Sequence, residues 1–230
     1  MLSAGERVLI KWGQMSVTAA RIPDLKSIEL PYLLRVYGVT EEMFDEIVDD
    51  EDTKAELIDG VLIVHSPASV EHDDVVTFIA GLLSFYAGRK RLGLVVGASN
   101  ALTRLKVGRR VAPEVFFVSQ AKVPSPLPKQ LEGAPDLVVE VLSPSNRGYD
   151  LGEKRAVYRA AGVAEIWFVD STTRAVVLDR RHGESYASET FTDGRVTSEV
   201  IAGFWLNVSW LWSPARPDPL SCLDEILGRT

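Results

Sequence analysis

Four charged residues stand at positions where their chemistry, rather than the fold alone, could account for them. Glu140 interrupts the apolar run LVVEVL, which is typical of a buried β-strand. A carboxylate in such a strand is costly unless something pairs with it. The other three residues lie near strand ends or in the first turn of an expected helix: Glu56, Glu114 and Lys154. The first question is therefore what Glu140 binds.

A metal ion is one answer. Carboxylates that converge repel one another unless a divalent cation neutralises them, and hard oxygen ligands suit Mg²⁺ or Mn²⁺. Such a metal polarises a phosphoryl oxygen and lowers the pKa of its bound water, while a lysine offsets charge in the transition state. Lys154 is expected at a helix N-terminus, where the helix dipole disfavours a cation. This placement indicates that an anion or a carboxylate lies nearby.

The residues alone leave structural alternatives open. A purely structural ion pair of Glu140 with Lys154 or an arginine fits the pattern as well as a metal ligand does, because ion-pair networks resemble functional sites. Glu114 and Glu56 also fit solvated carboxylates at a strand start and in a hairpin. His72 has the chemistry of a general base, but a histidine at the helix surface or the core edge is the favoured interpretation.

Turn and capping residues predict the elements that hold these groups. A short amphipathic helix is expected over 40–50, the Asp59-Gly60 pair predicts a hairpin, and a longer helix begins at Ser69. Three strands are expected after that helix: 93–99, 101–107 and 112–119. A proline-rich loop then leads into the strand that carries the central glutamate.

A strand–helix–strand unit surrounds that glutamate. The strand over 136–142 precedes a helix for which Asp150 is the expected N-cap and Glu153 its capping-box partner, and Gly162 closes the helix. The strand over 165–170 comes next, so the two strands should run parallel.

The alternating pattern that follows predicts a C-terminal β-meander. We expect an α/β fold with a mixed sheet, built as a single domain over 38–230, with an N-terminal extension over 1–37 packed on it. Met15 is an alternative start that the sequence leaves open.

Composition excludes several classes of protein. Apolar residues make up 46% of the 230 residues and charged residues 25%, the balance of a soluble globular protein. No apolar run approaches the ~20 residues that span a bilayer, and the first residues lack the apolar core of a signal peptide. One cysteine, Cys222, excludes an intrachain disulfide and a thiolate zinc cluster. We expect a cytoplasmic protein that does not enter the membrane.

The net charge of −7 argues against a general nucleic-acid coat protein. Any phosphate contact would have to come from a local basic patch. The candidates are the segments GRKRLG and RLKVGRR, the latter with Arg104 and Lys106, together with Arg147, Lys154, Arg155 and Arg159. A solvated charged face is the commoner explanation for such residues.

Three segments also carry a resemblance to a known family. They are AELIDGVLIVHSPASVEHDDVV, APEVFFVS and, above all, APDLVVEVLSPSNRGYDLGEKRAVYRAAGVAEIWFVD. From about Thr40 to about Leu211 the chain resembles the Uma-two family of restriction-endonuclease-like proteins, in the PD-(D/E)XK nuclease superfamily. The resemblance implies a mixed-sheet core of the αβββαβ type flanked by helices, Mg²⁺-dependent phosphodiester hydrolysis and frequently a homodimer.

The resemblance carries over to individual residues. Glu56 matches the acidic residue of the ELIDG motif, Glu114 stands where the family usually has aspartate after proline, and Glu140 matches the strand glutamate. The superfamily motif would place its lysine at Leu142, so the displaced lysine would have to be Lys154. The longer Glu114 side chain keeps the charge of aspartate but changes the metal geometry.

These residues, taken with the resemblance, imply a Mg²⁺- or Mn²⁺-dependent endonuclease acting on DNA. Glu114 and Glu140 would bind the metal, Glu56 would be a further ligand or a base, and Lys154 would stabilise the scissile phosphate or orient the attacking water. Two alternatives stay open: a binding or assembly module that has lost turnover, and a metal-dependent hydrolase of a substrate other than nucleic acid.

Overall fold

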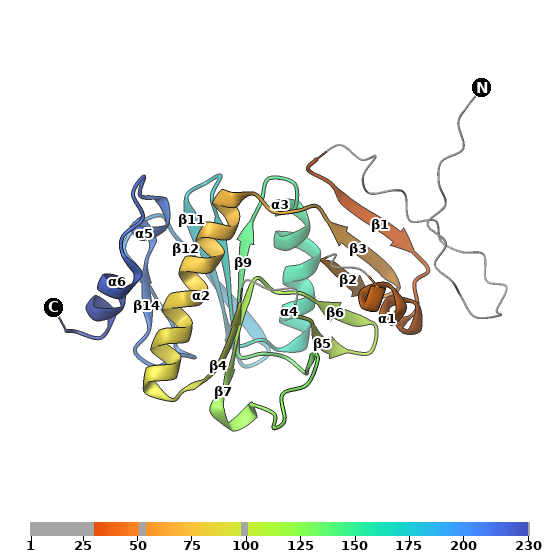
Figure 1. The fold of residues 1–230 in the computed structure, drawn as a ribbon, viewed down its shortest axis with the longest axis horizontal. Helices are drawn as coiled ribbons and strands as arrows, with labels where there is room; N and C mark the ends of the chain where they lie inside the picture. Colours follow the sequence, from red (N-terminus) through yellow and green to blue (C-terminus); the bar gives the residue numbers. More distant parts are fainter. Residues whose placement is uncertain (1–29, 51–53, 98–100, 230) are drawn as a thin grey trace.

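The computed structural model describes residues 30–50, 54–97 and 101–229 (Figure 1). Most of the expected N-terminal extension, including Met15, lies outside this part of the chain. Within it, two six-stranded sheets, called sheet A and sheet B here, are accompanied by helices and by a two-stranded sheet.

Sheet B contains the strand of the central glutamate. Its strands are β4 (Gly93–Gly97), β7 (Val115–Ser119), β9 (Leu137–Leu142), β10 (Glu165–Asp170), β11 (Ala175–His182) and β12 (Ser185–Phe191), in the order β12-β11-β10-β9-β7-β4. The predicted parallel pairing of β9 with β10 is confirmed, with Glu140 opposite Phe168. All other pairs in this sheet are antiparallel. The central strands are buried on both faces, which explains their apolar sequences.

Sheet A is built around the predicted hairpin. Its strands are β1 (Leu33–Tyr37), β2 (Ala55–Ile58), β3 (Val61–His65), β5 (Thr103–Lys106), β6 (Arg109–Val111) and β8 (Leu131–Glu132), in the order β1-β3-β2-β6-β5-β8. Asp59 and Gly60 both have positive φ, 48° and 84°, as a tight type I′ hairpin turn requires. Strand β1 shows that residues 33–37, assigned to the extension from the sequence, pair with β3.

The helices form layers with the two sheets (Figure 1). They are α1 (Glu41–Asp50), α2 (Val70–Lys90), α3 (Arg147–Tyr149), a π-helical turn (Asp150–Lys154), α4 (Arg155–Ala161), α5 (Val208–Trp212) and α6 (Pro219–Ile226). Helix α2 covers one face of sheet B, and the continuous helix from α3 to α4 lies between sheet B and sheet A. Helix α1 covers the far face of sheet A.

The helix after β9 begins earlier than the sequence predicts. Asp150 is not its N-cap: the backbone N–H of Asp150 already donates to the carbonyl of Asn146 at 2.9 Å, so the residue lies inside the helix. Glu153 does not form a capping box either, because its carboxylate binds Arg35. The predicted end is correct, since Gly162 follows Ala161 with φ of 80°.

The C-terminal meander is shorter than predicted. Strands β10, β11 and β12 form it, but β13 (Arg195–Thr197) leaves sheet B and pairs with β14 (Trp205–Asn207). This small sheet buries Val196 and Leu206 against the α2 side of the molecule, in the same apolar cluster as the face of β9 that α2 covers. None of the described helices combines the length and the apolar character that crossing a membrane requires.

Candidate active site

Strand alternation places the two most buried glutamates on facing surfaces. Glu140 shares one side of β9 with Val138 and Leu142, which pack in the apolar cluster between the sheets. Glu56 shares its side of β2 with Ile58, which belongs to the same cluster. The glutamates therefore approach one another from different sheets, with the helix from α3 to α4 between them.

Lys154 lies between these glutamates. Its Nζ is 2.8 Å from Oε1 of Glu56 and 2.9 Å from Oε1 of Glu140, and it donates to the carbonyl of Ala112 at 3.3 Å. Burial lowers the pKa of a lysine, but the carboxylates of Glu140 and Glu56 outweigh this effect and hold the pKa of Lys154 above its ordinary value. The lysine is thus a permanent cation inside the protein.

Glu56 is saturated with hydrogen bonds. Its Oε1 accepts from the backbone N–H of Ala112 at 2.7 Å and from Lys154, and its Oε2 accepts from the hydroxyl of Tyr149 at 2.7 Å and lies 2.9 Å from Nε2 of His65. Burial raises the pKa of this carboxyl, but Lys154 and His65 lower it by more than burial raises it. The pKa therefore lies well below the ordinary value. Glu56 is a fixed anion.

Glu140 has fewer partners. Oε1 contacts Lys154 and accepts from the hydroxyl of Tyr158 at 2.5 Å, while Oε2 makes no hydrogen bond to any described residue. Burial raises the pKa of Glu140, and the opposing effects of Lys154 and Lys54 do not bring it back to the ordinary value. The charge of this carboxylate is under-compensated.

Glu114 stands beside Glu140. Val115 pairs with Val139, so the antiparallel register of β7 and β9 brings Glu114 opposite Glu140. Its Oε1 accepts from Nζ of Lys54 at 2.5 Å, and its Oε2 makes no hydrogen bond to a described residue. Burial raises its pKa, but Lys54 and other cations lower it more.

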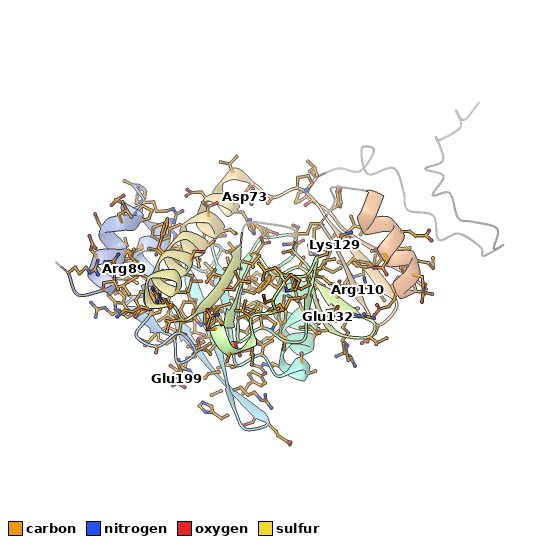
Figure 2. The ribbon with its side chains drawn as sticks, turned by 60° about the horizontal axis from the view of Figure 1, so that its bottom comes forward. Asp73, Arg89, Arg110, Lys129, Glu132 and Glu199 are labelled. Atoms are coloured by element: carbon orange, nitrogen blue, oxygen red, sulfur yellow. The ribbon has the colours of Figure 1, made fainter. Side chains whose placement is uncertain are left out.

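His72 completes this side of the cluster. Nε2 donates to the carbonyl of Val141 at 2.8 Å and lies 3.6 Å from Oε1 of Glu114. The residue comes from the first turn of α2, whose N-cap is Ser69. In Figure 2, its neighbour Asp73 marks that end of α2 and Arg89 marks the other end. The histidine is at the core edge, as favoured from the sequence, but it also contacts the carboxylate cluster.

The cluster contains more carboxylates than ammonium groups. Four carboxylates, those of Glu56, Glu114, Glu140 and Asp150, interact electrostatically with Lys154 and Lys54. With Asp150 protonated at neutral pH, the other three carboxylates outnumber the two ammonium groups by one negative charge. Asp150 is buried without a side-chain hydrogen bond to a described residue, and burial raises its pKa to about 8. A divalent cation would offset this excess of negative charge.

A metal ion fits the residues that are present. In the described part of the chain no three His, Cys, Asp or Glu side chains form a ready-made cage. Mg²⁺, however, is usually bound through one or two carboxylates and keeps several waters. Glu114 and Glu140 supply such an adjacent pair, each with one oxygen that no described residue occupies.

The expected phosphate-binding residues divide into two groups. Arg147 lies just after β9, its Nε donates to Asp170 at 2.9 Å, and 43% of its side chain is exposed. Arg104, on β5 of sheet A, instead pairs with Glu41 of α1 at 2.8 Å. Lys106, on the same strand, lies in the field of the hairpin residue Asp59. The structure records no contact of these last two basic residues with the carboxylate cluster.

Sequence reasoning missed several members of the cluster. Asp150 and Tyr158 lie four residues before and after the predicted Lys154 and therefore share its face of the helix, a signal that the sequence contains. His65 lies five residues beyond the hairpin turn, in a strand pattern that does not distinguish it from its neighbours. Lys54 carries no signal in the sequence, because only the tertiary fold brings it to Glu114.

Comparison with solved structures defines the class of the fold. The chain is similar to the crystal structure of a putative nuclease of the DUF820 group from Anabaena variabilis, with a TM-score of 0.64 and 17% identity over 73% of this chain and 96% of that one. The fold is thus restriction-endonuclease-like α/β, as predicted.

The family follows from the sequence match. Residues 41–209 match the model of the Uma2 family, which is described as "Putative restriction endonuclease", and the chain belongs to this family. The resemblance stated from the sequence is confirmed. No curated protein matches the chain.

Proposed function

We propose that the protein is a Mg²⁺- or Mn²⁺-dependent endonuclease that hydrolyses DNA phosphodiester bonds. The observation that carries this proposal is the adjacent pair Glu114 and Glu140, each with an oxygen that no described residue binds, in a cluster whose ionised carboxylates outnumber its ammonium groups. Membership of a family described as putative restriction endonucleases supports it. A cytoplasmic homodimer with a single domain over 38–230 is part of the same proposal.

The two carboxylates have the role of holding the metal. When bound, the metal polarises a phosphoryl oxygen and lowers the pKa of its water. Tyr158 and Lys154 both bind Oε1 of Glu140, which fixes the carboxylate so that Oε2 is left for the cation. Glu56 has no free oxygen, so we assign it to holding Lys154 rather than to ligating the metal.

Cleavage of DNA tests the proposal. Plasmid and single-stranded DNA are incubated with Mg²⁺ or Mn²⁺ and the wild-type protein, Glu140→Gln or Glu114→Gln. We expect cleavage by the wild type and none by either glutamine variant. The matched control is Asp179→Asn, which alters another buried carboxylate of sheet B outside the cluster. Wild-type protein without cleavage, or variants that cut equally well, would contradict the proposal.

Metal binding separates the alternatives. If Mn²⁺ binds the wild type, fails to bind Glu114→Gln, and no nucleic acid is cut, a metal-dependent hydrolase of another substrate becomes the better assignment. The acidic net charge of −7 keeps this second candidate open. If no metal binds, the protein is a binding or assembly module.

A further inference from the structure

The lysine of the family motif has no donor to offer a substrate. An ammonium group has three N–H donors. Those of Lys154 are directed to Glu56, Glu140 and the carbonyl of Ala112, and the residue is 1% exposed. Contact with a phosphate would break one of these interactions inside the protein. Lys154 is therefore suited to positioning Glu140 and not to binding the phosphate.

A second lysine has the freedom that Lys154 lacks. Lys54 precedes β2, and 19% of its side chain is exposed. Among the described residues, the side-chain ammonium contacts Glu114 alone, through Oε1 at 2.5 Å. Two of its three donors are thus available. Its charge also acts on Glu56, Glu140 and Asp150, which places it within the electrostatic field of the whole cluster.

We propose that Lys54 is the lysine that contacts the substrate phosphate, and that Glu114 holds it until a metal ion takes over this carboxylate. The inference rests on the metal site of the proposed function. A divalent cation on the other oxygen of Glu114 competes with the ammonium group for the same charge and repels it, so metal binding weakens the ion pair of Lys54 with Glu114. The released ammonium then needs another anion, and a phosphate bound at the metal would lie beside Glu114 and supply one.

Metal affinity without DNA tests whether Glu114 holds Lys54 before the metal binds. Mn²⁺ binding is measured by calorimetry and by electron paramagnetic resonance for wild type, Lys54→Met and Lys54→Arg. We expect Lys54→Met to bind Mn²⁺ roughly fivefold to tenfold more tightly, because no partly buried ion pair has to be broken. Lys54→Arg should bind about as the wild type does. Lys122→Met is the matched control, since Lys122 pairs with Asp136 on the surface.

The salt dependence of DNA binding tests whether Lys54 contacts the substrate phosphate. The probe is a phosphorothioate-substituted duplex, which is hydrolysed slowly. With Mn²⁺, we expect Lys54→Met to reduce the slope of log affinity against log salt by about one, the value of one lost phosphate contact. Without metal the slope should match that of the wild type, because Glu114 then holds the lysine. A merely structural ion pair would give no such metal dependence.

The outcomes separate this inference from the proposed function. Equal Mn²⁺ affinity in wild type and Lys54→Met, both abolished by Glu114→Gln, would overturn the role of Lys54 and leave the metal site intact. Absence of Mn²⁺ binding in both proteins would overturn both. Binding by Lys54→Met but not by the wild type supports the inference. Circular dichroism melting confirms that each variant is folded.

Discussion

Two buried carboxylates of sheet B have opposite electrostatic states. Asp179 in β11 is 0% exposed and Glu140 in β9 is 2% exposed. Asp179 binds the guanidinium groups of Arg155 and Arg159 at 2.5 and 2.7 Å and accepts from the hydroxyl of Ser188 at 2.7 Å. Burial raises its pKa, but these partners lower it below the ordinary value. The pKa of Glu140 is raised instead.

The difference teaches that burial alone does not mark a site. Asp179 has two cations to itself, whereas Glu140 shares Lys154 with Glu56 and lies opposite Glu114. A fully paired carboxylate contributes to stability, and an under-compensated one has affinity left for another cation. The two residues therefore form an internal contrast between a structural and a functional carboxylate.

The largest expected effect is on catalysis by Glu140→Gln. We expect cleavage activity to fall at least about 1,000-fold, because one side of the metal site and its charge are lost. The melting temperature without metal should change little, since glutamine still accepts from Tyr158 and Lys154 keeps Glu56. Initial rates on plasmid DNA and thermal melts check both. A wild-type cleavage rate in Glu140→Gln would show that Glu140 is a structural carboxylate like Asp179.

The next effect is on stability, from Asp179→Asn. Removing the charge leaves two arginines facing an amide, which is expected to lower the free energy of unfolding by about 2 kcal/mol. The cleavage rate of the folded variant should equal that of the wild type. Urea unfolding and rates measured well below the melting temperature decide this. A loss of activity without a loss of stability would show that Asp179 is part of the site.

The pH dependence of stability separates the two regions. In the cluster, burial raises the pKa of Asp150 to about 8, although Lys154 opposes the shift. Its unfolded value is about 3.9, so between roughly pH 4 and pH 8 the folded chain holds a proton that the unfolded chain has released. The free energy of unfolding should therefore fall as pH rises, by less than the one-proton limit of about 1.4 kcal/mol per unit.

Asp179 should behave in the opposite way. Its lowered pKa stabilises the fold above about pH 4, and this contribution is lost as pH falls through its folded value. Urea unfolding at several pH values checks both signs. Asp150→Asn should flatten the slope above pH 5 and Asp179→Asn the slope below pH 4. An unchanged slope in Asp150→Asn would mean that the cluster is compensated after all.

The sequence predicted those parts of the fold that depend on local signals. The Asp59-Gly60 pair identified the hairpin because few residues accept positive φ. The apolar runs identified β9 and β10, and Gly162 identified the helix end. The start of that helix was wrong, because Asp150 resembles a cap locally while its carboxylate is drawn into the cluster. The departure of β13 from the meander likewise depends on packing against α2.

Four residues of the candidate site could be identified from the sequence, but most of their partners could not. The types and order of Glu56, Glu114, Glu140 and Lys154 were visible, and the structure brings Glu56, Glu140 and Lys154 into direct contact. The separate roles of these residues could not be predicted, because the roles depend on which carboxylate oxygens and ammonium donors already form hydrogen bonds within the protein. Nor does a sequence show that Lys54 reaches across 60 residues to Glu114.

The smallest expected effect compares two arginines. Arg147 lies at the end of β9 with 43% of its side chain exposed, and its partner Asp170 also accepts from the backbone N–H of Thr172. Arg159, in contrast, is committed to Asp179. We expect Arg147→Ala to lower the salt slope of DNA binding by about one with little loss of stability. Arg159→Ala should lower the melting temperature and leave the slope unchanged. If both variants kept the salt slope of the wild type, DNA would not contact the end of β9. The DNA would then have to reach the carboxylate pair from the side of sheet A.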